Sequence, residues 1–303
     1  MGRQISKGSF GEVRMVTCRR TGEVLVLKRS LKPLIGEASL KQERAHSKIL
    51  ALFANNYPHL LRHHAAWVEE AHVYLITDLC PGGDLFMKLS KGPFSNQDSI
   101  RIVMLDVGKG LQRLHSMGFI HADIKPQNIF LGPDGRYVIG DFGNMCLIGG
   151  NRVPDMDCRY RPRETLNGTL TPSADTFGLG LVLVECAMEE SLPKSGERWS
   201  DIRDGRGLFS RCKIDLSLGL KRMIESMLAP APAKRPTARQ VVEFATTTID
   251  DEKIVGGEPK EKRDSKTKTV CQPTSKTAIG AKDAKPCRKL PESPSRSRCV
   301  CIL

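Results

Sequence analysis

The sequence predicts an α+β fold in which a small β-rich lobe precedes a larger helical lobe and a disordered tail. Short runs of β-branched and alternating apolar residues lie within the first 80 residues, and after Gly82 and Gly83 the pattern becomes largely helical. From residue 251 onward Lys, Arg, Ser, Thr and Pro dominate, and aromatic residues are absent. We therefore expect lobes at residues 1–79 and 80–246, and a basic disordered tail at 247–303.

Three strands of the first lobe are expected at residues 13–17, 24–28 and 73–77. The first two bracket a turn at residues 20–22, which ends in a glycine. An earlier strand would have to use residues 2–6, so we expect it to be truncated. The clearest helices of the second lobe are expected at residues 99–114, 174–188 and 218–228.

The composition excludes several classes of protein. The longest apolar stretch covers about 13 residues and contains Glu185, so it is too short and too polar to cross a bilayer. The N-terminus shows no secretory signal. The ten cysteines are therefore expected to be free thiols, and their spacing does not predict a zinc site. His59, His63 and His64 are interpreted as structural residues rather than metal ligands.

The tail carries about half of the basic character of the chain. Residues 251–303 contain 13 basic and 7 acidic residues, so they supply +6 of the formal net charge of +13. Such a segment is either a solvated linker or a weak contact for acidic membrane or protein surfaces. Nucleic acid is not expected, because no aromatic residues interleave with the charges. Residues 1–6 fit the N-myristoylation pattern, but we favour coincidence because the first strand needs them.

Two strings carry the chemistry. Residues 121–128 read His-Ala-Asp-Ile-Lys-Pro-Gln-Asn, and residues 141–143 read Asp-Phe-Gly. Phosphoryl transfer needs a carboxylate for the attacking hydroxyl, a lysine near the migrating phosphate, and an amide and a second carboxylate for magnesium. Asp123, Lys125, Asn128 and Asp141 supply these groups in that order. The strings resemble the catalytic loop and metal-binding triplet of protein kinases, which implies the bilobal protein-kinase fold.

The first lobe contains the parts that handle phosphate in that family. Residues 6–13 read Ser-Lys-Gly-Ser-Phe-Gly-Glu-Val and resemble the glycine-rich loop, with Ser6 in place of the first glycine. Lys28 follows 17 residues after Gly11, where a kinase places the lysine that contacts the α- and β-phosphates. Glu43 is the candidate partner of Lys28, with a surface glutamate as the alternative. The ATP-binding candidates here are Ser6, Gly8, Gly11, Val13, Lys28 and Glu43.

Residues 73–84 resemble the strand and hinge between the lobes of a kinase. That resemblance places Thr77 at the back of the adenine pocket and the main chain of Asp78 and Cys80 against adenine, with Asp84 within reach of ribose. Cys80 lies at the pocket mouth, where we expect an inert thiol rather than a reactive one. Three structural roles are also implied. Glu164 pairs with a buried Arg235, and Asp175 anchors the backbone of the catalytic loop.

Four strings resemble one group of kinases, the Wee/Myt kinases that inhibit cyclin-dependent kinases. They are residues 28–34, 66–70, 121–133 and 192–206, of which the last is the most specific. The resemblance covers about residues 4–246 and leans towards the Myt branch. It implies ATP- and magnesium-dependent phosphorylation of a Thr or Tyr in the glycine-rich loop of a cyclin-dependent kinase, bound to its cyclin, which delays mitotic or meiotic entry. A cytoplasmic or nuclear location follows, with weak attachment to internal membranes through the tail or N-terminus as an alternative.

Two other functions stay open. An ordinary serine/threonine kinase would carry the same Lys125, which is typical of that class. A pseudokinase scaffold that binds cyclin-dependent kinases would explain Ser6, the uncertain Glu43 and the irregular Pro162 and Arg163. The complete set of catalytic groups argues against the scaffold.

Ala122 is the main departure within the catalytic loop. Many kinases carry an arginine there, and it pairs with a phosphate on the activation loop. Between Gly143 and Glu164 the chain contains no serine or threonine, and Tyr160 is the one tyrosine. Both the arginine and the usual serine or threonine that would carry the phosphate are therefore missing. The sequence therefore predicts a kinase that is active without activation-loop phosphorylation and is controlled by abundance, location or its tail.

Overall fold

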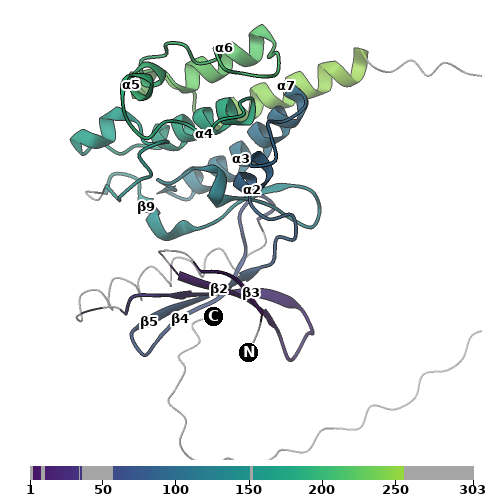
Figure 1. Ribbon diagram of the computed structural model, residues 1–303, viewed down its shortest axis with the longest axis vertical. Helices are drawn as coiled ribbons and strands as arrows, with labels where there is room; N and C mark the ends of the chain where they lie inside the picture. The colour runs from purple at the N-terminus through teal and green to yellow at the C-terminus, as the bar shows by residue number, and fades with distance from the viewer. Residues whose placement is uncertain (1–2, 8–10, 34, 36–56, 151–152, 256–303) are drawn as a thin grey trace, which may run out of the picture.

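The chain forms a β-sheet region followed by a helical region, which lie one above the other (Figure 1). The computed structural model describes residues 3–7, 11–33, 35, 57–150 and 153–255, without the side chains of residues 6–7 and 248–255. The predicted α+β bilobal fold is confirmed.

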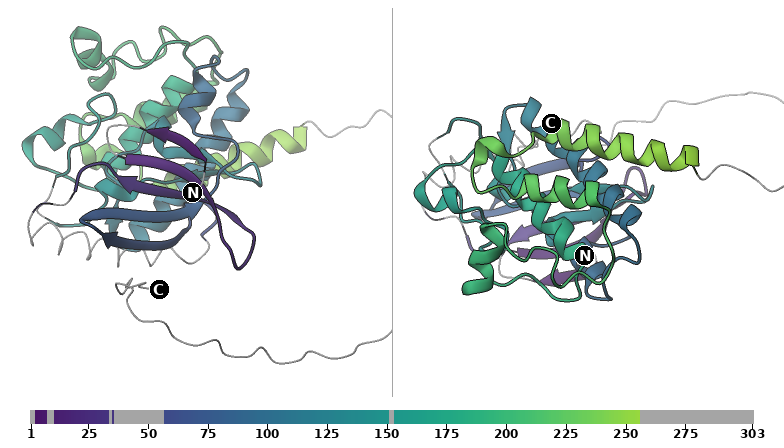
Figure 2. Two further views of the ribbon diagram at one scale, coloured as in Figure 1. Left: turned by 60° about the horizontal axis from the view of Figure 1, so that its bottom comes forward. Right: turned by 90° about the horizontal axis from the view of Figure 1, so that it is seen from above.

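The first region is an antiparallel sheet with the strand order β1-β2-β3-β5-β4 (Figure 2). Its strands are β1 Gln4–Lys7, β2 Gly11–Thr17, β3 Val24–Ser30, β4 His63–Glu69 and β5 His72–Asp78. The three predicted strands are confirmed, each with one or more extra residues. The turn between β2 and β3 ends at Gly22, whose φ of 72° is a conformation that glycine adopts readily.

Strand β4 is the strand of this sheet that was not predicted from the sequence. It pairs with β5 so that Glu69 lies opposite His72, which leaves Glu70 and Ala71 as a two-residue turn. Both have positive φ, 48° and 60°. Turns of this kind normally use Asn or Gly, because other residues resist positive φ. The sequence therefore lacks the usual signal for this hairpin.

The helical region is built around two helices, α3 Gln97–Ser116 and α4 Ser173–Cys186. Helix α3 begins after Asn96, whose side chain accepts a hydrogen bond from Ser99 N at 3.0 Å. Helix α4 is buried at every residue from Ala174 to Cys186, as expected for a helix that is apolar on all sides. The remaining helices are α2 Leu85–Leu89, α5 Glu197–Arg203, α6 Leu218–Met227 and α7 Ala238–Val255.

Helix packing in this region depends on small residues. A Cβ on Gly180 of α4 would lie 2.9 Å from the side chain of Leu228, just after α6, so the close approach of these helices requires glycine. Helix α7 packs along α3 and continues to Val255, past residue 246, where we expected the tail to begin. Residues 256–303 lie outside the described part.

Two small sheets carry the strings identified from the sequence. Strands β6 Phe119–Ile120 and β9 Cys146–Leu147 form one pair, and β7 Ile129–Leu131 and β8 Tyr137–Ile139 form the other. Residues 121–128 connect β6 to β7, and residues 140–145 connect β8 to β9. Leu61 N donates to Ile139 O at 2.8 Å, which ties the sheet region to this part of the helical region. Both strings are thereby placed near the junction.

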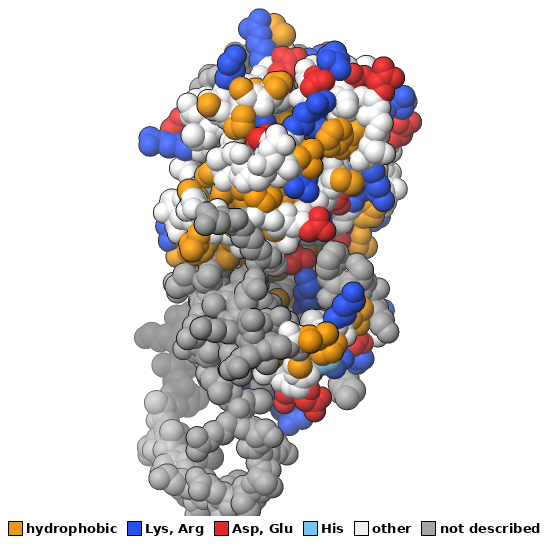
Figure 3. Space-filling model, turned by 90° about the vertical axis from the view of Figure 1, so that its left-hand side faces the viewer, with side chains coloured by type: hydrophobic (Ala, Val, Ile, Leu, Met, Phe, Trp, Pro, Cys, Tyr) orange, Lys and Arg blue, Asp and Glu red, His pale blue; other side chains and the backbone are white. Residues whose placement is uncertain are grey.

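The surface of the helical region is mixed in character. On the face drawn in Figure 3, basic and acidic side chains are interspersed among apolar ones. Among the residues that the structure describes, no helix combines the length and the apolar character that crossing a bilayer would require.

Candidate active site

The loop between β6 and β7 brings three predicted residues together. Asp123 Oδ2 accepts hydrogen bonds from Lys125 Nζ at 2.7 Å and from Asn128 Nδ2 at 3.0 Å. Asn128 Nδ2 also donates to the main-chain oxygen of Asp123 at 2.8 Å. Because the amide nitrogen is committed to these contacts, the amide oxygen of Asn128 is the atom left to coordinate a cation.

Asp175 holds this loop from below. Its side chain is fully buried in α4, and it accepts hydrogen bonds from His121 N at 2.9 Å and Ala122 N at 2.8 Å. His115 Nε2 lies 2.8 Å from the same carboxylate. Ala122 has a φ of 61°, a conformation that costs a non-glycine residue free energy and persists only where its surroundings enforce it. The predicted anchoring role of Asp175 is confirmed.

Asp141 and Lys28 form an ion pair between the two regions of the chain. Lys28 Nζ, from β3, lies 2.8 Å from Asp141 Oδ2, which follows β8. Burial alone would raise the pKa of Asp141, but the charge and hydrogen bond of Lys28, with the charges of His121 and Lys125, lower it below its usual value. The Asp141 carboxylate is therefore ionised and able to hold a cation.

The glycine-rich string is only partly described. Ser6 lies in β1 opposite Val13 of β2, and Val13 lies opposite Lys28 of β3. A Cβ on Gly11 would lie 2.7 Å from the main-chain oxygen of Arg29, so this glycine is required by the close approach of β3. Gly8 lies outside the described residues. Glu43 does too, so its pairing with Lys28 stays a prediction.

The predicted hinge follows β5 directly. Thr77 is buried, and its hydroxyl donates to the main-chain oxygen of Asp78 at 3.2 Å. Burial, with smaller contributions from the charges of Asp78 and Asp134, raises the pKa of Cys80 to about 11. The Cys80 thiol is therefore protonated and poorly nucleophilic at neutral pH.

Asp84 has a structural contact at the end of the hinge. Its Oδ1 accepts a hydrogen bond from Met87 N at 2.7 Å and so caps α2. Burial raises the pKa of Asp84, against the effect of its main-chain hydrogen bonds. The predicted contacts of the hinge residues with adenine and ribose stay predictions.

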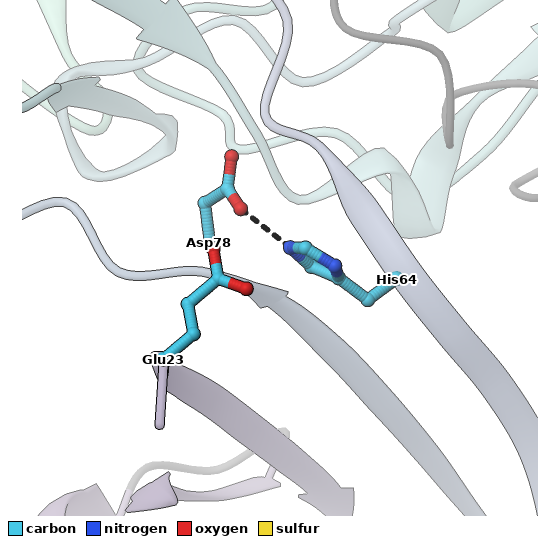
Figure 4. Close-up of side chains that lie close together, drawn as sticks. All are labelled: Glu23, His64 and Asp78. Atoms are coloured by element: carbon cyan, nitrogen blue, oxygen red, sulfur yellow. Dashed lines mark hydrogen bonds and ion pairs between the residues drawn. The ribbon is translucent and has the colours of Figure 1, made fainter. Parts of the chain in front are cut away.

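The three histidines near the hinge do not converge. His59 lies near Asp106, and His63 Nδ1 lies 3.0 Å from the main-chain oxygen of Leu61. His64 instead points at Asp78, with Nε2 2.5 Å from Oδ1, and Glu23 approaches the same pair (Figure 4). His64 thus braces the start of the hinge from the neighbouring strand.

The segment between the metal-binding triplet and Glu164 is held at its end by two buried contacts. Arg235 donates to both oxygens of Glu164, at 2.5 and 3.1 Å, which confirms the predicted pair. Tyr160 is 3% exposed, and its hydroxyl donates to Glu185 Oε2 at 2.5 Å. Burial and the charge of Glu185 raise the pKa of Tyr160 far above its usual value. Tyr160 is therefore not accessible to another enzyme in this conformation.

Comparison with known proteins agrees with this geometry. The model of the protein kinase domain family matches residues 1–245. The chain belongs to the protein kinase family. It is therefore a protein kinase, a class of transferase that generally uses ATP and magnesium.

The relatives of this kinase domain include several Wee1-like enzymes. It is 32% identical over 267 residues to the mouse Wee1-like protein kinase 2, covering 78% of this chain and 47% of the relative. The zebrafish Wee1-like protein kinase 2 is 31% identical over 265 residues, covering 77% and 48%.

A nematode protein is similar to the same extent. The Caenorhabditis elegans membrane-associated tyrosine- and threonine-specific cdc2-inhibitory kinase wee-1.3 is 33% identical over 243 residues, covering 79% of this chain and 35% of the relative. The predicted resemblance to the Wee family is confirmed, whereas these identities do not distinguish the Myt branch. The chain spans about half the length, or less, of the relatives it matches.

The residues of the kinase domain fit magnesium and ATP. Magnesium prefers oxygen ligands, and the Asn128 amide oxygen and the ionised Asp141 carboxylate offer them. The ammonium group of Lys28 lies beside that carboxylate, where it can also contact phosphate oxygens. The assignment of individual residues to nucleotide and metal stays a prediction.

Two features of the site were missed by reading the sequence. His121 is fully buried, and its Nε2 lies 3.1 Å from Gly140 O, so it links the catalytic loop to the residue before Asp141. Arg203 of α5 is 2% exposed and contacts the segment around Tyr160. Residues 192–206 were recognised only by resemblance, and no periodicity marked Arg203 as buried.

Proposed function

We propose that this kinase phosphorylates a threonine or tyrosine in the glycine-rich loop of a cyclin-dependent kinase and so delays entry into mitosis or meiosis. The proposal rests on the similarity to Wee1-like kinases, one of which is named as a tyrosine- and threonine-specific cdc2-inhibitory kinase. A cyclin-dependent kinase bound to its cyclin is the proposed protein substrate.

One structural observation supports an active enzyme. The ion pair of Lys28 with Asp141 and the network of Asp123, Lys125 and Asn128 are both formed, at 2.7 to 3.0 Å. A scaffold without activity has no need of either. The intact set therefore favours the enzyme over the pseudokinase alternative.

The roles of the residues follow from their chemistry. Bound ATP with magnesium supplies the phosphoryl group. Asp123 orients the substrate hydroxyl and accepts its proton, and Lys125 offsets the negative charge that develops on the transferred group. Asn128 and Asp141 hold magnesium through oxygen atoms, and Lys28 fixes the phosphates that stay behind. Asp175 keeps the loop in position through its hydrogen bonds to His121 and Ala122.

The acceptor residue is tested directly on the substrate. We expect the purified chain, with ATP and magnesium, to label a catalytically inactive cyclin-dependent kinase bound to its cyclin. Phosphoamino-acid analysis should find phosphotyrosine or phosphothreonine, and a substrate whose loop threonine and tyrosine are replaced should lose the label. Phosphoserine alone would instead support an ordinary serine/threonine kinase. Binding without any transfer would support the scaffold.

A further inference from the structure

The activation segment, residues 144–163, offers no hydroxyl group that another kinase could reach. Tyr160 is the only hydroxyl-bearing residue in it, and this side chain is buried against Glu185. Ala122 cannot pair with a phosphate. A segment of this length still has to be held in place next to the catalytic aspartate, because ordering a chain costs about 1–2 kcal/mol per residue.

Arg203 supplies three further contacts that hold the segment. The guanidinium donates to three main-chain oxygens of the segment, those of Cys158 at 2.8 Å, Arg159 at 2.8 Å and Arg161 at 2.9 Å. Its fourth hydrogen bond goes to Trp199 O in its own helix, at 3.2 Å. All four acceptors are main-chain carbonyl oxygens. The planar fork of an arginine suits this task, since it presents several donors in fixed directions.

Trp199 fixes the arginine from the other side. Its ring centroid lies 3.7 Å from the Arg203 guanidinium carbon, and its indole Nε1 donates to Cys158 O at 2.8 Å. The aromatic face stabilises the buried cation. Burial lowers the pKa of Arg203 to about 10, so the group stays charged at neutral pH.

The residues that Arg203 contacts directly follow Asp157, which contacts the catalytic aspartate. Asp157 N donates to Asp123 Oδ1 at 3.5 Å, one residue before the first carbonyl that Arg203 binds. Asp157 is in turn fixed by Arg159, whose guanidinium donates to both carboxylate oxygens at 3.0 and 2.7 Å. A shift of residues 158–161 would therefore move the main chain that borders Asp123.

We propose that Arg203, braced by Trp199, is the positioning residue that holds the activation segment in the place of an activating phosphate. The inference rests on the proposed kinase activity. In a phosphorylated kinase the charge is added to the segment and a fixed arginine captures it. Here the cation belongs to α5 and its acceptors are main-chain carbonyls, so the contact needs no modification and no phosphatase can remove it.

The test compares Arg203→Met and Arg203→Lys with Arg206→Met in the full chain. Arg206 is a matched control because it lies just after the same helix, is exposed, and pairs only with Asp201 and Asp204 among the described residues. We expect Arg203→Met to lower kcat/KM for the protein substrate about 100-fold, the loss that a misplaced reacting group produces. Binding of a fluorescent ATP analogue with magnesium should not change. Arg203→Lys should recover part of the rate, and Arg206→Met should match the wild type.

Limited trypsin digestion measures how often the activation segment opens. Cleavage after Arg159 and Arg163 should accelerate about 10-fold in Arg203→Met, because proteolysis follows the population of the opened segment. Trp199→Phe keeps an aromatic ring but removes the indole N–H that donates to Cys158 O, and it should give a smaller acceleration.

Two results would overturn the inference. One is wild-type transfer by Arg203→Met with the segment still protected. The other is equal loss of nucleotide binding and protection throughout the chain, which would make Arg203 a residue of the core alone. If the wild type labels no cyclin-dependent kinase, the proposed function fails, whereas the digestion and nucleotide-binding measurements still test the role of Arg203.

Discussion

Replacing Asp175 with asparagine should destabilise the protein and disable the catalytic loop together. The fully buried carboxylate accepts from His121 N and Ala122 N, one on each oxygen, and lies 2.8 Å from His115 Nε2. Asparagine keeps the shape but places an amide donor against one of these donors. A hydrogen bond to a charged acceptor contributes about 1.5–3 kcal/mol. Losing one outright and weakening the others should cost about 3 kcal/mol.

Thermal unfolding measured by circular dichroism checks this magnitude. For a domain of this size, about 3 kcal/mol corresponds to a fall in Tm of about 6–12 °C. Transfer should also be lost, because the positive φ of Ala122 is no longer enforced. Asp215→Asn is the matched control, since that side chain is 97% exposed and pairs with Lys221 on the surface. It should change stability by less than about 0.5 kcal/mol. An unchanged Tm for Asp175→Asn would refute the anchoring argument.

Three other predictions follow from single contacts. Burial raises the pKa of Glu185, so the stability that its proton contributes is fully present below the ordinary carboxyl pKa and is lost as pH rises through the raised value. Urea unfolding should show the wild type losing stability relative to Glu185→Gln as the pH rises above the ordinary carboxyl pKa of about 4. Iodoacetamide at neutral pH should label Cys80 more slowly than Cys18, because burial raises the pKa of Cys80 to about 11 whereas hydrogen bonds from Thr21 lower that of Cys18; equal rates by mass spectrometry would contradict this. Lys28→Met should reduce the rate of phosphoryl transfer about 100-fold. It should change the free energy of unfolding by less than about 1 kcal/mol, because the ion pair of Lys28 with Asp141 is partly exposed. A large loss of stability would show that the ion pair is mainly structural.

The elements predicted from sequence are those whose signal is local. Helix α3 follows from its apolar period, and β2 and β3 follow from their β-branched residues and Gly22. Strand β4 was missed because Glu70 and Ala71 form its turn without glycine or asparagine. The pairing of β4 with β5 in the sheet stabilises these residues at positive φ, and the local sequence does not predict that pairing.

The catalytic groups were predictable because phosphoryl transfer requires particular side chains in a fixed order. Asp123, Lys125 and Asn128 lie within six residues, so the loop alone brings them together. Arg203 was not predictable in this way. Its acceptors are main-chain oxygens about 40 residues earlier. Every residue carries such an oxygen, so the sequence does not indicate which of them accept a hydrogen bond. The same holds for the burial of Tyr160, which depends on Glu185 in α4.

The most direct test of the central claim is whether the chain inhibits a cyclin-dependent kinase by phosphorylating it. An active cyclin-dependent kinase bound to its cyclin would be incubated with ATP, magnesium and either the wild type or Asp123→Asn, and its activity on a third protein then measured. We predict that the wild type abolishes this activity, that a phosphatase acting on the modified loop restores it, and that Asp123→Asn has no effect. Undiminished activity after incubation with the wild type, or equal inhibition by Asp123→Asn, would contradict the account.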